Sequence, residues 1–344
     1  MRPELIARLR SVARVRRRPA RGGPLILLYH RVAHADTDPQ ALAITPERFD
    51  EHLSFIEAQC EPVALRDLVA AVHDGGSTGA RRAVAVTFDD GYADNLSVAK
   101  PLLERTGVPA TVFVASGYVR APKPFWWDEL ERVLLRAKQL PPTLDLEIEG
   151  ENLRVDLGDG TAAAGDGWTV LRKDAPTPRH AAYRDLCARL RMLDEAERES
   201  TLQVLTSLVD AENGESAHSP RPLTADELAR LAEGDLIDVG AHTVSHPVLA
   251  ELPRGRQEDE IASGKEELEE ILGRPVASFA YPYGGGSDFD ATTVSLVRAA
   301  GFDHACTALA GVVTSRTNRF RLPRIVVRNC TPDELEQLLS RVPS

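Results

Sequence analysis

The chain has 344 residues, of which 43% are hydrophobic and 27% charged, which is the composition of an ordinary soluble globular protein. Its formal net charge of −11 argues against nucleic acid as a main partner and provides no obvious binding surface for polyanionic glycans. The four cysteines (Cys60, Cys187, Cys306 and Cys330) lack C-x-x-C spacing, which predicts reduced thiols and a cytoplasmic location.

The first 22 residues form a basic N-terminal arm with eight arginines and one acidic residue. Leu5, Leu9 and Val12 fall on one face of a helix, with arginines around the rest. Two interpretations stay open: a peripheral helix that docks on anionic lipid, and a solvated or partly disordered terminus. The arm lacks the apolar core and cleavage site of a secretory signal, and no run of about 18 apolar residues predicts a membrane span.

From residue 23 onward, short apolar runs alternate with amphipathic stretches. Strands are predicted at 24–29, 84–88, 110–115, 236–240, 277–281 and 324–327. Helices are predicted at 45–60, 95–107, 224–233, 256–273 and 291–301. This order predicts a parallel sheet with crossover helices.

An insertion at about 120–221 interrupts the alternation. It is predicted to contain a helix that begins near Phe125, a β-hairpin at 143–157, a glycine-rich loop at 158–167 and one long helix at 181–209. Trp126 and Trp127 could stack on a sugar face, but Trp126 shares a helical face with apolar neighbours, so packing is expected for one of the pair. The insertion is the expected place of substrate selection, because it follows a sheet strand.

Two motifs at predicted strand ends carry chemistry. Asp89 and Asp90 follow the run 84–88, and His242 and His246 follow the run 236–240. Histidines four residues apart would point the same way from one helical turn. Two imidazoles and a carboxylate with a position open for water are a usual catalytic zinc set, and a neighbouring carboxylate can serve as the base.

These motifs resemble those of the polysaccharide deacetylases, also called the NodB-homology family or carbohydrate esterase family four. The T-F-D-D-G run at 87–91 and the H-T-V-S-H-P run at 242–247 are similar to the family's first and second motifs. The A-Y-P-Y run at 280–283 is similar to the third, and L-Y-H-R-V at 28–32 to the start of many bacterial members. The resemblance implies a distorted (β/α)7-type barrel, here one domain at 23–344 interrupted by the insertion.

The resemblance also implies roles for single residues. Asp90, His242 and His246 would bind a divalent metal, for which the ligand set predicts Zn²⁺, and Asp89 would take a proton from the metal-bound water. The backbone N–H of Tyr283 would stabilise the oxyanion. The reaction would remove the N-acetyl group from an amino sugar, expected to be a glycan precursor, a lipid- or nucleotide-linked sugar, or a small glycoside.

The sequence departs from the family in two places. The third-motif arginine, which orients the base, is Ala280, and the closing L-x-H motif is absent from the stretch L-P-R-I-V-V-R at 322–328. Arg324 is a candidate replacement near Asp89, with a surface salt bridge as the alternative. His30, at the end of the run 25–29, is expected to line the site.

Tyr92 and Tyr283 adjoin motifs and are expected in the cleft, with Tyr92, His30 and Trp127 contacting substrate. His304 is expected to be structural. Two other functions stay open: a non-haem iron protein, since two histidines and a carboxylate also form that site, and a metal-dependent carbohydrate-binding or scaffold protein with a degenerate site.

Overall fold

The computed structural model describes residues 22–73, 81–121, 123–159, 167–209 and 220–342. Residues 1–21 of the basic arm and most of the glycine-rich loop lie outside these residues. The main sheet is parallel, with seven strands in the order β11-β10-β9-β6-β5-β1-β12 and β4 paired to β5. Its strands are β1 (Leu25–Tyr29), β4 (Cys60–Pro62), β5 (Arg82–Phe88), β6 (Ala110–Val114), β9 (Ile237–Ala241), β10 (Ser278–Ala280), β11 (His304–Cys306) and β12 (Ile325–Val326).

The sheet curls into a distorted barrel. Between its end strands, the amide of Thr307 donates to the carbonyl of Leu322 at 2.8 Å, and the amide of Arg324 donates to the carbonyl of Leu309 at 3.0 Å. These bonds join the segment after β11 to the segment before β12. The predicted (β/α)7-type fold is therefore confirmed, and all six predicted strands are present, shifted at their ends by at most three residues.

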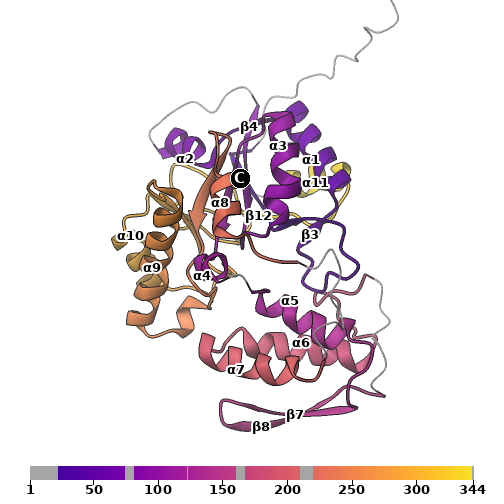
Figure 1. Cartoon of the computed structure of the whole chain (residues 1–344). Helices are drawn as coiled ribbons and strands as arrows, with labels where there is room; N and C mark the ends of the chain where they lie inside the picture. The colour runs from indigo at the N-terminus through magenta and orange to yellow at the C-terminus, as the bar shows by residue number, and fades with distance from the viewer. Residues whose placement is uncertain (1–21, 74–80, 122, 160–166, 210–219, 343–344) are drawn as a thin grey trace, which may run out of the picture.

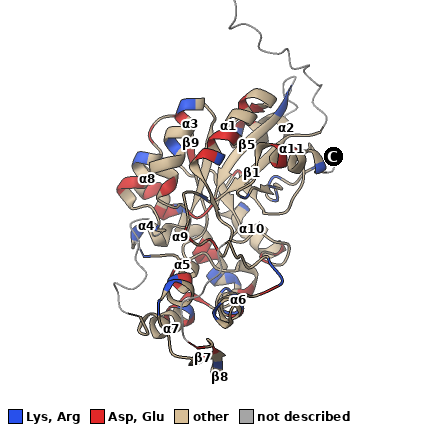
Figure 2. Cartoon of the chain, turned by 90° about the vertical axis from the view of Figure 1, so that its right-hand side faces the viewer, with Lys and Arg blue, Asp and Glu red and all other residues tan. Residues whose placement is uncertain are grey.

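Helices surround the barrel and carry most of its charged residues, whereas the strands are largely apolar (Figure 2). They are α1 (Pro46–Gln59), α2 (Leu65–His73), α3 (Lys100–Thr106), α4 (Ser116–Arg120), α8 (Ala225–Leu231), α9 (Arg254–Leu272), α10 (Ala291–Ala299) and α11 (Pro332–Arg341), with single turns at Asn95–Ala99 and Leu249–Glu251. A short parallel pair, β2 (Arg31–Val32) and β3 (Ala43–Ile44), lies beside the barrel. The predicted helices are present, while the helices α2, α4 and α11 and the strands β2, β3, β4 and β11 were not among the predicted elements.

The insertion packs below the barrel in Figure 1 and has a hydrophobic core of its own. It contains α5 (Trp126–Glu131), a π-helical turn at Arg132–Arg136, the antiparallel hairpin of β7 (Thr143–Ile148) and β8 (Glu151–Asp156), α6 (Pro178–Leu190) and α7 (Glu195–Thr206). The prediction of one long helix at 181–209 is wrong. Asp194 caps a new helix by accepting the amide of Glu197 at 2.9 Å, so α6 and α7 are separate.

All four cysteines are free thiols, as predicted. Among the described residues, no helix combines the length and the apolar character that a membrane span requires.

Candidate metal centre

Asp90, His242 and His246 converge at the carboxyl ends of the central strands. Their ligand atoms all lie within 4.8 Å of one another, and the three residues are buried. Nε2 of His246 lies 3.4 Å and Nε2 of His242 lies 3.7 Å from Oδ1 of Asp90. A tetrahedral zinc ion with ligands at 2.0–2.1 Å separates its donor atoms by about 3.3 Å. The set therefore fits a tetrahedral cation after small side-chain movements.

The order of strands brings these distant residues together. Asp90 follows β5 and His242 follows β9, and β6 lies between these two strands. The backbone carbonyl of Val114, at the end of β6, accepts the amide of His242 at 3.0 Å. Parallel strands end at one edge of the sheet, so both motifs face the same space.

The two histidines are not placed by a helical turn, and that prediction is wrong. Residues 242–246 form a tight loop, in which Thr243 has φ 65° and His246 has φ 58°. This left-handed backbone is unfavourable for a β-branched residue such as Thr243. Glu260 of α9 holds the loop, because its Oε2 accepts two successive amides at 2.9 Å and its Oε1 accepts the Ser245 hydroxyl at 2.7 Å.

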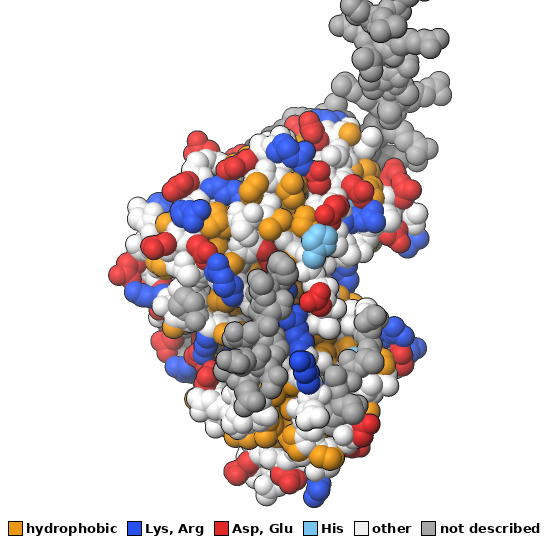
Figure 3. Space-filling view, turned by 45° about the vertical axis from the view of Figure 1, so that its right-hand side comes forward, with side chains coloured by type: hydrophobic (Ala, Val, Ile, Leu, Met, Phe, Trp, Pro, Cys, Tyr) orange, Lys and Arg blue, Asp and Glu red, His pale blue; other side chains and the backbone are white. Residues whose placement is uncertain are grey.

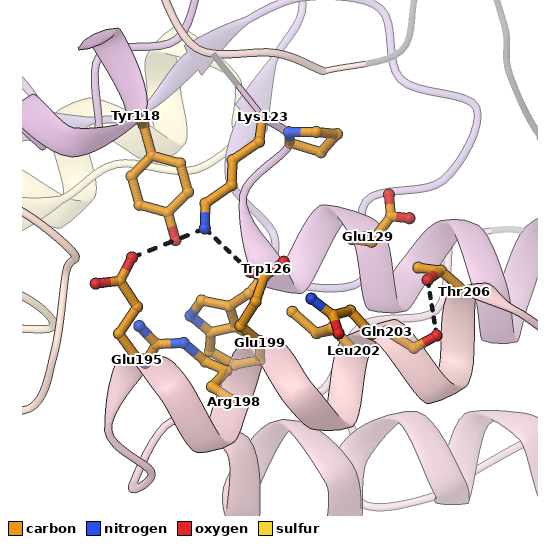
Figure 4. A pocket seen from close by; sticks show the side chains of 11 residues that line it. Tyr118, Lys123, Trp126, Glu129, Glu195, Arg198, Glu199, Leu202, Gln203 and Thr206 are labelled. Atoms are coloured by element: carbon orange, nitrogen blue, oxygen red, sulfur yellow. Dashed lines mark hydrogen bonds and ion pairs between the residues drawn. The ribbon is translucent and has the colours of Figure 1, made fainter. Parts of the chain in front are cut away.

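Two further residues support this loop from outside. Gly264 of α9 lets the loop approach closely, since a Cβ there would lie 2.9 Å from the backbone carbon of Thr243. Arg198 of α7 is buried and donates to the carbonyl of Ser245 at 3.1 Å. In Figure 4, Arg198 lies against Trp126 in a small cavity of the insertion, next to the ion pairs of Lys123. The insertion thus helps to shape the metal loop.

Both histidines are prepared as neutral ligands. Nδ1 of His242 lies 2.7 Å from the carbonyl of Ala280, so it carries the proton and leaves the Nε2 lone pair free. Burial lowers the pKa of His242 and lowers the pKa of His246 well below its usual value. Burial, followed by the charges of Asp89 and Asp128, raises the pKa of Asp90 well above its usual value. A bound cation would favour the ionised carboxylate of Asp90 and so lower this pKa again.

Asp89 is held by Arg324 rather than by the metal set. Nη1 and Nη2 of Arg324 lie 2.6 and 2.7 Å from Oδ1 and Oδ2 of Asp89, and its Nε donates to the carbonyl of Thr307 at 2.8 Å. Arg324 is fully buried, so it is not a surface arginine. Burial alone would raise the pKa of Asp89, but Arg324 outweighs it and the pKa is lowered.

A cleft of about 890 Å³ opens over this centre between the barrel and the insertion, where Figure 3 shows the surface hollowed. His30, Trp127 and Tyr283 line it, as do the four motif residues. The Trp127 ring lies edge-on to His246, 5.0 Å between centroids, and the Tyr283 ring lies 4.7 Å from the same imidazole. Burial lowers the pKa of His30 to about 4.

Tyr92 does not line the cleft, contrary to expectation. It is fully buried behind Trp127, whose Nε1 donates to the Tyr92 hydroxyl at 2.7 Å. That hydroxyl donates in turn to Asp128 at 3.0 Å. The position of Tyr92 next to the motif did not show which way its side chain points. The left-handed backbone at Asp90 and Gly91 turns Tyr92 into the core of the insertion. His304 is buried at the start of β11 and is not among the residues that line the cleft.

Sequence reasoning missed Glu260, Arg198, Gly264 and Asp128. The first three belong to the supports of the metal loop, and the fourth to the hydrogen-bonded layer beneath Trp127. No local pattern distinguishes Glu260 from the other acidic residues of α9, which are mostly exposed.

Comparison with known proteins agrees with this architecture. The sequence profile described as polysaccharide deacetylase matches residues 76–137 and 184–305 and leaves out 138–183 within the insertion. YxkH of Bacillus subtilis (strain 168), which bears the name of a polysaccharide deacetylase, is 26% identical over 89 residues, which are 26% of this chain and 30% of YxkH.

Solved structures share the fold over most of the chain. The deacetylase PplD of Streptococcus pyogenes, solved with acetate, has a TM-score of 0.57 and 17% identity, covering 93% of this chain and 99% of its own. IcaB of Ammonifex degensii has a TM-score of 0.54 and 19% identity, covering 93% and 97%. A de-N-acetylase of Aggregatibacter actinomycetemcomitans has a TM-score of 0.54 and 14% identity, covering 91% and 98%. Because the family profile matches more than half of its residues, the chain belongs to the polysaccharide deacetylase family.

Proposed function

We propose that this protein is a metal-dependent hydrolase that removes the N-acetyl group from an amino sugar. The observation that carries the proposal is the Asp89–Arg324 pair, which lies beside the Asp90, His242 and His246 set at the base of an open cleft. A base that is held apart from three metal ligands is the arrangement that hydrolysis of an amide requires.

Asp90, His242 and His246 would hold the cation, and two imidazoles with one carboxylate suit a catalytic Zn²⁺ ion. When bound, the cation would polarise the acetamido carbonyl and acidify a water molecule. Metal analysis by mass spectrometry distinguishes zinc from the iron of a non-haem iron protein.

Asp89 would accept the proton of the attacking water. Its low pKa keeps it ionised, and Arg324 uses one lone pair of each carboxylate oxygen, which leaves others for the water. Arg324 would also fix the orientation of this carboxylate. It would replace the third-motif arginine of the family, whose position is occupied by Ala280 in this chain. Addition of water across the C–N bond gives acetate and the free amine.

The Tyr283 backbone N–H is the proposed donor to the oxyanion. Tyr283 has φ 59°, and its amide has no hydrogen-bond acceptor within the described part of the chain. An amide that is free and fixed by its backbone is suited to stabilise developing negative charge.

His30 and Trp127 would contact the sugar. His30 is neutral at neutral pH because of its lowered pKa, so it would act as a neutral hydrogen-bonding group. Trp127 presents its ring beside His246 at the base of the cleft, close to the reacting amide. We assign the insertion, about 120–221, to substrate selection and residues 23–344 to one interrupted barrel domain.

The test is release of acetate, and of new primary amine detected with fluorescamine, from a panel of N-acetylated sugars. Asp89→Asn should abolish turnover and leave the metal bound, whereas His246→Ala should lose both. A fully active Asp89→Asn variant would contradict the assignment of the base. Bound sugar without acetate release in the wild-type protein would instead support a binding protein.

Contact of the basic arm with membranes is a separate proposal, since residues 1–21 lie outside the described residues. Vesicle flotation with the full chain and with residues 1–22 deleted tests it. Equal flotation of the two proteins on anionic vesicles would contradict a role for the arm.

A further inference from the structure

The mouth of the cleft is more basic than the protein as a whole. Apart from Asp89 and Asp90, the charged residues that line it are three arginines (Arg184, Arg191 and Arg328) and two acids (Glu251 and Asp288). The whole chain has a formal net charge of −11, so basic groups are concentrated at this place against the overall balance. The five groups at the mouth carry one more positive than negative charge, and guanidinium groups there attract anions.

Two of these arginines keep side-chain donors that a ligand could use, although Arg191 is already ion-paired to Asp288. Arg328 follows β12, is exposed, and makes no hydrogen bond or ion pair through its side chain within the described part of the chain. Its charge does act at longer range on His30, which lines the same cleft, and on the carboxylate of Asp38. Arg191 follows α6 on the facing wall, and its Nη2 donates to Asp288 at 2.9 Å. Its Nε is buried without a partner, while its guanidinium lies 4.3 Å from the centroid of the Tyr283 ring.

Arg184 differs from these two. Its Nη1 and Nη2 donate to backbone carbonyls of residues 172–174, so it holds the loop after Thr169 against α6. It is therefore a structural cation, and the anion site consists of Arg191 and Arg328. Guanidinium groups on two walls suit a phosphate, whose oxygens can accept from both sides.

Exposed apolar side chains lie next to these cations. Leu171 is 58% exposed and Met192 is 46% exposed, and both line the cleft on its insertion side. Met192 directly follows Arg191, so the anion site and the apolar rim are adjacent. Large apolar residues at the rim of a polar cleft indicate contact with an apolar ligand group.

Building on the proposed function, we propose that the substrate is an N-acetylated sugar joined through phosphate to an apolar chain. The acetamido group lies at the metal centre, the phosphate between Arg191 and Arg328, and the apolar chain over Leu171 and Met192. The neutral sugar and the charged phosphate thus occupy the inner and outer parts of one cleft of about 890 Å³.

The experiment compares acetate release by the metal-loaded protein from conjugates of N-acetylglucosamine, with a matching N-acetylgalactosamine set. The four conjugates are the neutral methyl glycoside, the methyl phosphodiester, the octyl phosphodiester and the uridine diphosphate sugar. The methyl phosphodiester should exceed the methyl glycoside in kcat/KM by about tenfold, as expected for one charge-assisted contact. The octyl phosphodiester should exceed the methyl phosphodiester again, by about tenfold.

Matched variants locate each effect. Arg328→Gln should lower the ratio of kcat/KM for the methyl phosphodiester to that for the methyl glycoside to near one. The exposed Arg316, outside the cleft lining, serves as the control, and Arg316→Gln should keep the wild-type ratio. The double variant Leu171→Ser with Met192→Ser should remove the advantage of the octyl chain. Val204→Ser with Leu208→Ser is its control, since these exposed apolar residues lie outside the lining.

Binding of octyl phosphate, measured by calorimetry below its critical micelle concentration, separates this proposal from the deacetylase function. Binding that weakens in Arg328→Gln, without acetate release from any conjugate, would keep the anion site and reject the reaction. Acetate release from the neutral glycoside, with octyl phosphate binding that Arg328→Gln leaves unchanged, would overturn the anion site. If the uridine diphosphate sugar is deacetylated as well as the octyl conjugate, the proposal that the substrate carries an apolar chain is wrong.

Discussion

Replacement of Arg324 by methionine tests the base and its support together. The substitution removes two hydrogen bonds of 2.6 and 2.7 Å to Asp89 and leaves that carboxylate buried without its counter-charge. Breaking a buried ion pair from one side destabilises a protein by about 3–5 kcal/mol. With an unfolding entropy of about 2.1 cal/mol/K per residue, this corresponds to a fall in Tm of roughly 4–7 °C for a domain of this size.

The loss of activity has a separate cause. Without Arg324, burial favours the protonated form of Asp89, which cannot accept a proton. Loss of a general base lowers kcat by about 10²–10⁴-fold. Acetate release gives this value, differential scanning fluorimetry gives the Tm, and mass spectrometry checks that the metal is retained.

The double variant Asp89→Asn with Arg324→Met separates the two effects. Removal of both charges should restore much of the stability that Arg324→Met loses, while activity stays absent. If the double variant melts no higher than Arg324→Met, the pair is not the source of the instability. An Arg324→Met protein with wild-type turnover would refute the role of Arg324 in holding the base.

The remaining predictions concern the supports of the metal loop and the cleft floor. Glu260→Ala should weaken zinc binding by about 10–100-fold, measured by competition with a chromophoric chelator, and exposed Glu258→Ala on the same helix should not. Gly264→Ala should also weaken zinc binding, because the new Cβ would meet the backbone of Thr243, whereas Gly255→Ala has open space and should preserve it; equal affinities in the two variants would refute the contact. Trp127→Phe should lower the free energy of unfolding by about 1 kcal/mol through loss of its bond to Tyr92, as followed by urea denaturation, and an unchanged midpoint would speak against that bond.

The insertion illustrates how far local patterns reach. The hairpin at 143–157 alternates apolar and polar residues, and the structure has β7 and β8 there with the expected buried face. The break between α6 and α7 was harder to predict, because the residues around Met192 are compatible with a continuous helix. Asp194 ends that continuity only because its side chain accepts the amide of Glu197 in the folded chain.

Arg324 shows a similar limit at the site. The chain has many arginines, and the sequence left open whether this one lies at the surface or beside Asp89. Its position follows from the pairing of β12 with β1 and of β1 with β5, which places residue 324 across the barrel from residue 89. Tyr92 is the opposite case, because its position beside a motif suggested the cleft and the backbone turns it away.

By itself the sequence determined the two motifs, the parallel alternation of strands and helices, and hence the edge of the sheet where Asp90, His242 and His246 meet. These features follow from periodicity and from residues that are close in the chain. Only the tertiary structure decided which side chains hold the metal loop, which arginine pairs with Asp89, and which cations line the mouth of the cleft. Those partners are far apart in sequence, and their positions depend on packing across the whole barrel and its insertion.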